Sequence, residues 1–125
     1  MKKNGILISL AALLLTACGS SNPKDVTESF VNALQSGDLK VLQELSTPTT
    51  FSLINMSLSM QCGEKDIPSC AKEMSKNEVV KDYVAVSQTE TEAVVNVKIE
   101  KNGNLKNSRY DLIKTENGWK VNLKK

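Results

Sequence analysis

The sequence predicts an α+β domain, with helices in the first half of the chain and an antiparallel sheet in the second. Apolar residues recur at helical spacing between residues 22 and 45, and they alternate with polar residues at strand spacing from Glu78 onward. Helices followed by a run of strands, rather than an alternation of the two, are typical of the α+β class. Four strands joined by short turns predict an antiparallel meander.

The chain has 125 residues, three cysteines and no histidine. This length suits one domain of ordinary size. Without histidine, the chain lacks the usual general base near neutral pH and the commonest metal ligand, which excludes histidine-based triads and zinc sites that need histidine. No metal or cofactor is expected, because the scattered carboxylates do not have the spacing of a calcium-binding loop.

Residues 1–17 have the three parts of a secretory signal peptide. Lys2 and Lys3 form the charged start, and an apolar run follows from Gly5 to Leu15. This run has about 11 residues, whereas a membrane-spanning helix needs about 20. The run ends in Leu15-Thr16-Ala17-Cys18, which resembles the lipobox of bacterial lipoproteins. The alternative is an ordinary signal peptide with a chance cysteine at its cleavage point.

The lipobox resemblance implies that Cys18 is lipidated, carries acyl chains such as palmitate, and becomes the N-terminus of the mature protein. Residues 18–22 then form a lipidated tether, and residues 23–125 form the single domain. The expected partner of this end is a lipid bilayer, since each buried methylene of an acyl chain contributes about 0.8 kcal/mol. Gly19 after the cysteine implies, in an enteric-type bacterium, the outer membrane, with the domain facing the periplasm.

Removal of the leader changes the charge and cysteine counts. Lys2 and Lys3 leave, so 14 of the 16 basic residues remain against 14 acidic residues and the net charge is zero. Nucleic-acid binding is not expected, because it needs a concentrated basic surface. Cys62 and Cys70 are the remaining thiols, and outside the cytoplasm a disulfide is their expected state. A redox-active pair is the alternative, but catalytic dithiols favour a two-residue spacing.

The first helix is predicted to begin at Asn22-Pro23, a capping residue followed by proline at the first helical position. Gly37 is a natural stop for this helix. Asp38 then caps a second short helix that ends before Pro48. Apolar residues at helical spacing mark the buried side of the two helices: Val26, Phe30, Ala33 and Leu34 in the first, and Leu39, Leu42 and Leu45 in the second.

The segment 51–62 fits two patterns. From Ile54 to Cys62 apolar and polar residues alternate, as in a strand, but Phe51, Ile54, Leu58 and Cys62 also have helical spacing. The residues themselves leave the choice open. From residue 78 the pattern is that of strands, with turns at Asn102-Gly103-Asn104 and at Glu116-Asn117-Gly118. The expected strands cover 79–86, 93–100, 105–115 and 119–123.

Both ends of the mature chain resemble small bacterial lipoproteins of the nuclear transport factor 2-like superfamily, in its lumazine-binding-like group. The residues that carry the resemblance are Pro23 to Leu34, Gly37-Asp38, and the closing segment from Tyr110 through Trp119 to Val121. The resemblance implies a cone-shaped, cystatin-like α+β fold in which a curved sheet wraps around helices, and it favours a helix over 51–62. It does not cover the segment from Cys62 to Cys70. It implies little about function, because this superfamily hosts isomerases, dehydratases, carriers and binding modules.

The enzyme-like combination in this chain is a carboxylate with a tyrosine. Asp82 shares strand parity with Val80 and Val84, which predicts that it points into a pocket beside Tyr83 or Tyr110. A buried aspartate there can act as a general base. The competing interpretation places Asp82 at a strand end or bulge in contact with solvent, and no second catalytic group is evident near it.

Two further sets of residues, the methionines and the C-terminal lysines, each have a structural and a functional interpretation. Met56, Met60 and Met74 are predicted to fill the core rather than to line an adaptable groove. The C-terminal lysines are predicted to keep the sheet soluble rather than to form a binding face: Lys114, Lys120, Lys124 and Lys125.

The expected function is that of a non-enzymatic envelope lipoprotein that binds a small molecule or another envelope protein. The first alternative is a pocket enzyme that uses Asp82 with a tyrosine. The second is an interaction or immunity-type lipoprotein that acts through its surface. An internal polar cavity favours a ligand binder or enzyme, whereas a filled core favours a protein partner.

Overall fold

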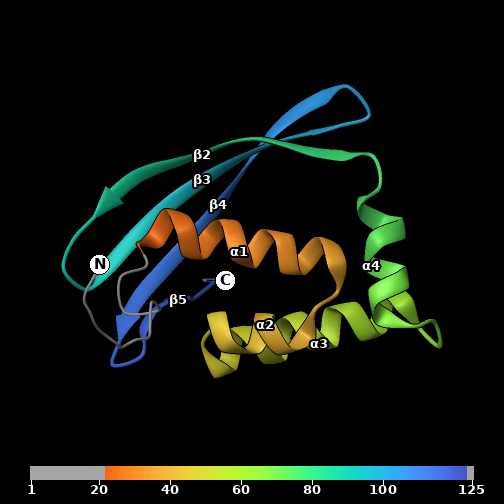
Figure 1. Ribbon diagram of the computed structural model, residues 1–125, viewed down its shortest axis with the longest axis horizontal. Coiled ribbons are helices and arrows are strands. Elements are labelled where there is room, and N and C mark those ends of the chain that lie inside the picture. The colour runs from red at the N-terminus through yellow and green to blue at the C-terminus, as the bar shows by residue number, and fades with distance from the viewer. Residues whose placement is uncertain (1–21, 124–125) are drawn as a thin grey trace, which may run out of the picture.

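The computed structural model describes residues 22–123, so the signal peptide, Cys18 and the last two lysines lie outside the described residues. Four helices precede a four-stranded antiparallel sheet, as the sequence predicts. Figure 1 shows the helices gathered on one side of the curved sheet. The fold class is therefore α+β.

The helices begin and end at capping residues. Helix α1 covers Pro23–Ser36, and the Asn22 side chain accepts a hydrogen bond from the backbone N–H of Asp25 at 2.8 Å. Gly37 ends it with a left-handed φ of 70°. Helix α2 covers Leu39–Leu45, with Asp38 accepting from the N–H of Val41. Both helices lie where the capping signals predict them.

Helix α3 covers Pro48–Cys62, so the helical alternative for this segment is confirmed and the strand alternative is wrong. Its buried residues are Thr50, Ile54, Leu58 and Cys62, which lie one turn apart on a single side of the helix. Helix α4, Ile67–Ser75, was not predicted. Its start has a recognisable signal, because Asp66 caps it and Pro68 occupies its second position.

The sheet has the order β2-β3-β4-β5, in which each strand pairs with the next along the chain. The strands cover Glu78–Gln88 (β2), Glu92–Lys101 (β3), Asn104–Thr115 (β4) and Gly118–Val121 (β5). Strand β2 is therefore a free edge. Two β-bulges interrupt its pairing with β3, one between Val80 and Asp82 and one between Ala85 and Ser87.

Side chains from the helices and the sheet fill the space between them. On β3 the buried residues alternate along the strand, and helix α1 packs against β2, β3 and β5. The main cluster draws on three helices and three strands, and several of its members are entirely inaccessible to solvent, among them Phe30, Leu42, Val95 and Val121. A smaller cluster joins Val31 to Val97 and Ile99. The interior thus forms a packed core.

Within residues 22–123, no helix is long and apolar enough to cross a membrane.

Candidate functional site

An open groove separates helix α1 from the free edge strand β2. Its volume is about 410 Å³. One wall is a polar row on α1, in which Lys24, Glu28 and Asn32 follow one another at intervals of one turn. The other wall is the first bulge of β2 and its neighbours: Val80, Lys81, Asp82 and Tyr83. Residues far apart in the sequence thus form one polar surface.

The first bulge of β2 overturns the parity prediction for Asp82. Tyr83 pairs with Val97, which is fully buried, whereas Asp82 pairs with Lys98, which is exposed. Residues directly opposite each other in a sheet share a face. Asp82 therefore lies on the outer face of the sheet, and it also lines the groove. Its carboxylate accepts a hydrogen bond from the backbone N–H of Tyr83 at 2.9 Å.

The two tyrosines lie on the inner face, at different depths. Tyr83 lines the groove, and burial together with the charge of Glu28 raises the pKa of its phenol. Tyr110 packs edge-to-face on Phe30, with ring centroids 5.9 Å apart. Burial raises the pKa of Tyr110, and the nearby Tyr83 and Glu78 add to the effect. Both phenols are therefore protonated at neutral pH and can donate a hydrogen bond.

The charges of the groove are only partly neutralised within the domain. Lys81 forms an ion pair with Glu100, with 3.1 Å between Nζ and Oε1. Over the part of the chain that the structure describes, Lys24, Glu28 and Asp82 take part in no ion pair. The groove thus carries one cation and two anions that form no ion pair within residues 22–123.

Asp82 lacks the burial that strengthens a carboxylate as a general base, because its side chain is exposed. Tyr83 also lines the groove, whereas Tyr110 does not. Among residues 22–123, no group of three or more acidic or cysteine side chains is placed to hold a metal ion.

Cys62 and Cys70 are joined by a disulfide, with 5.8 Å between their Cα atoms. It links the end of α3 to α4, and both cysteines are buried. Beside it, Gly37 packs directly against Ile67 and Pro68 at the start of α4. The disulfide therefore fixes the one helix that neither periodicity nor resemblance predicted.

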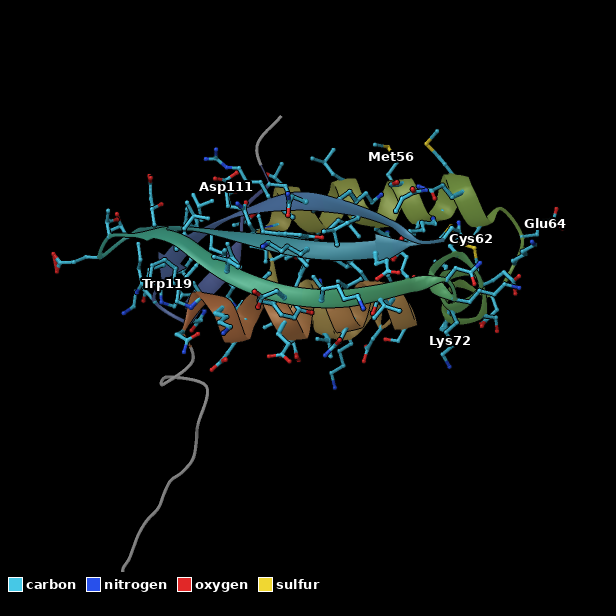
Figure 2. All side chains as sticks on the ribbon, turned by 90° about the horizontal axis from the view of Figure 1, so that it is seen from above. Met56, Cys62, Glu64, Lys72, Asp111 and Trp119 are labelled. Atoms are coloured by element: carbon cyan, nitrogen blue, oxygen red, sulfur yellow. A yellow bond between two sulfur atoms is a disulfide. The ribbon has the colours of Figure 1, made fainter. Side chains whose placement is uncertain are left out.

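The methionine prediction is wrong for two of the three residues. Met56 and Met60 are 55% and 78% exposed, and only Met74 packs against the core. The reason is that α3 carries apolar residues on two sides, and only one of them faces the domain. In Figure 2, Met56 points away from the body of the domain.

Two of the four C-terminal lysines lie within the described residues. Lys114 lies over the ring of Trp119, 5.8 Å from its centroid, and Lys120 donates a hydrogen bond to the carbonyl of Glu44. Both lysines therefore contact other residues of the domain itself.

Sequence reasoning missed the polar row of α1. Lys24, Glu28 and Asn32 repeat every four residues, which is a signal for one helix face. Nothing in the spacing indicates that this face lies along an edge strand, because that depends on how the helix and the sheet pack.

The fold and the groove define a class of small α+β domain with a packed interior and a polar groove beside a free strand. The chain belongs to the family described as "Domain of unknown function (DUF4878)", which matches residues 16–122. No curated protein matches the chain.

Among solved structures, the chain is similar to a protein from Campylobacter jejuni described as "Putative NTF2-like transpeptidase". The TM-score is 0.54 at 21% sequence identity, and the match covers 83% of this chain and all of the other. The fold is therefore nuclear transport factor 2-like, as the resemblance implies. At this identity the likeness concerns the fold alone.

Proposed function

We propose that this protein is a non-enzymatic binding module of the bacterial envelope, anchored to a membrane through lipid on Cys18, that recognises another envelope protein through its surface. The observation that carries the proposal is the filled interior. Phe30, Leu42 and Val95 are entirely inaccessible to solvent and belong to the main cluster between the helices and the sheet, so side chains of the domain itself fill this space. Recognition is therefore expected at the surface.

The groove between α1 and β2 is the surface that we assign to this recognition. Its lining is mostly charged and polar, which does not suit a small apolar molecule. Charges of both signs favour a protein segment that offers complementary charges, since such pairs set orientation and specificity. The protonated Tyr83 adds a hydrogen-bond donor with an apolar body, a combination common at protein interfaces.

The anchor rests on the lipobox resemblance. Changing Cys18 to serine is expected to release the protein from the membrane fraction and to abolish incorporation of labelled palmitate. A Cys18→Ser protein that stays with the membrane would contradict the anchor and leave the groove untested by that measurement.

The groove can be tested by photo-crosslinking in living cells. A photoreactive amino acid at Asn32 is expected to capture an envelope protein, whereas the same group at Gln43, exposed on α2, is expected to capture none. The charge swap Lys24→Glu with Glu28→Lys keeps the net charge and is expected to remove most of the adduct. The matched control is Lys40→Glu with Glu44→Lys, an exposed pair at the same spacing on α2.

Equal adducts at Asn32 and Gln43, or an adduct that survives the groove swap, would refute the assignment. Native mass spectrometry of protein extracted from the envelope supplies an independent check. A small molecule retained in stoichiometric amount would replace the protein-binding proposal by a ligand-binding one.

A further inference from the structure

The sheet ends at strand β2 in an edge that no other strand covers. Its residues pair with β3 on one side, and within residues 22–123 no strand pairs with the other side. An edge strand presents a row of backbone N–H and C=O groups that an extended segment of another protein can use for hydrogen bonds. The groove beside α1 lies along this edge, so the backbone groups of β2 and the polar row of α1 border the same space.

The dimensions of the groove suit a short extended segment. Along α1, the row from Lys24 to Asn32 covers about 12 Å at about 1.5 Å per residue. Along β2, the wall from Val80 to Tyr83 covers about 10 Å at about 3.3 Å per residue. An extended segment of about four residues has the same length.

The two bulges of β2 exclude a long strand as the occupant. They interrupt its regular pairing between Val80 and Asp82 and between Ala85 and Ser87, which leaves a regular stretch from Asp82 to Ala85. Asp82 and Tyr83 belong both to this stretch and to the wall of the groove. Bulges twist and bend an edge, which prevents a long flat strand from pairing along it. The 11-residue β2 of a second copy therefore cannot pair along its whole length, whereas a segment of about four residues can.

The charges along α1 match the repeat of an extended chain. Lys24 and Glu28 are exposed, form no ion pair within residues 22–123, and lie one turn apart, about 6 Å along the helix axis. In an extended segment, side chains on the same face recur every second residue, about 6.6 Å apart. Alternate side chains of a segment in the groove therefore reach Lys24 and Glu28 in turn, with Asn32 one turn further on.

The direction of the strands fixes the order of the complementary charges. Helix α1 and strand β2 run side by side in opposite directions (Figure 1), and every pair among the four strands is antiparallel. A segment that adds to β2 in the same antiparallel way runs parallel to α1 and reaches Lys24 before Glu28. We infer that the groove binds a short extended segment of a partner protein as an added edge strand, in which an acidic residue is followed two residues later by a basic residue. This mode of binding rests on the proposed function, and it specifies the conformation and the charge order of the segment that the groove recognises.

Three fluorescent peptides test this mode of binding on the full-length protein in detergent. The first is a heptapeptide of valine and threonine with glutamate at its third position and lysine at its fifth. The second exchanges the glutamate and the lysine, and the third keeps the first sequence but carries N-methyl groups on its three central backbone nitrogens. Fluorescence anisotropy is expected to show the first peptide binding about tenfold more tightly than the second, because attractive charge pairs replace repulsive ones. The third peptide is expected not to bind, since it cannot form the backbone hydrogen bonds of an added strand.

Exchanging the two groove charges is expected to reverse the preference between the first two peptides. With Lys24→Glu and Glu28→Lys combined, the second peptide is expected to bind about tenfold more tightly than the first. The α2 swap, Lys40→Glu with Glu44→Lys, changes an exposed pair at the same spacing and is expected to leave the preference of the wild type unchanged. A reversed preference cannot come from a misfolded variant, because a loss of folding weakens the binding of both peptides.

The added strand is refuted if no peptide binds, if the N-methylated peptide binds as tightly as the first, if the order of the charges makes no difference, or if the groove swap leaves the preference unreversed. Photo-crosslinking at Asn32 is read separately. An adduct in cells without a preference among the peptides would keep the proposed recognition and refute the added strand. A preference that reverses with the swap, without an adduct in cells, would keep the strand site and refute the recognition of an envelope protein.

Discussion

Replacing Gly37 by alanine is expected to be among the most damaging changes of a single small residue in this domain. Gly37 has a φ of 70°, in the left-handed region, and it ends α1. A Cβ atom at this position would lie 2.7 Å from the Cα of Pro68 and 2.8 Å from the carbonyl oxygen of Ile67. Both of these are backbone atoms at the start of α4, so neither can move aside alone.

The expected cost has two parts. A residue with a Cβ in the left-handed conformation costs about 1–2 kcal/mol. Forcing extra atoms into a packed contact costs about 1–3 kcal/mol more. Gly103→Ala is the matched control, because Gly103 has a φ of 84° and no atom within 4 Å of the added Cβ. Gly103→Ala is therefore expected to lose only the free energy that the left-handed conformation costs a residue with a Cβ.

The measurement is urea unfolding of both variants and of the wild type. The free energies of unfolding are compared when the slope of free energy against urea concentration is the same for all three proteins. Gly37→Ala is expected to lose about 1–3 kcal/mol more of the free energy of unfolding than Gly103→Ala. An equal loss of the free energy of unfolding in the two variants would refute the argument. It would show that the close contact between Gly37 and the start of α4 does not add to the cost of a Cβ. A changed slope would instead indicate an altered compactness of one of the two states.

Three further outcomes are expected. The mature protein should show no free thiol until it is reduced, and loss of the Cys62–Cys70 disulfide should cost about 2–3 kcal/mol by the chain-entropy model; two titratable thiols in unreduced material would contradict this. Because the folded-state pKa values of Tyr83 and Tyr110 lie above the ordinary value of 10.0, the stability that they contribute is complete below pH 10 and falls as the pH rises further. Absorbance titration should place both phenols above 10, and Tyr110→Phe should reduce the alkaline loss of stability; midpoints at 10 would contradict it. Leu42→Ala should cost about 2–5 kcal/mol by thermal or urea unfolding, because Leu42 is fully buried, and a loss below 1 kcal/mol would contradict the packed core.

The features that could be predicted from the sequence are those set by local interactions. Asn22, Asp38 and Gly37 begin or end helices through hydrogen bonds and backbone conformations within a few residues. The alternation of apolar and polar residues in β3 likewise predicts a strand, because one face of that strand is buried along its length. These signals require no knowledge of what the element packs against.

Helix α4 and the orientation of Asp82 could not be predicted in the same way. Helix α4 is short, and its place depends on the disulfide to α3 and on the contact with Gly37, which both come from elsewhere in the chain. Asp82 follows a bulge, and one extra residue in a strand exchanges the two faces for every residue beyond it. The alternation of apolar and polar residues in the sequence does not show where a strand contains an extra, unpaired residue. It therefore does not predict the change of face at Asp82.

The exposed methionines show a further limit. Both sides of α3 are apolar, so the sequence cannot tell which of them faces the core. The choice is made by the packing of Ile54 and Leu58 against the main cluster. Met56 and Met60 therefore remain exposed although the opposite side of the same helix is buried.

The proposed anchor would set where the proposed groove lies relative to the membrane. Asn22, the start of the described chain, lies four residues after Cys18, and a chain of this length spans at most about 14 Å when extended. The proposed anchor would therefore hold Lys24, in the first turn of α1, and one end of the groove near the membrane. With the anchor in place, a partner that reaches Lys24 would have to approach close to the membrane surface.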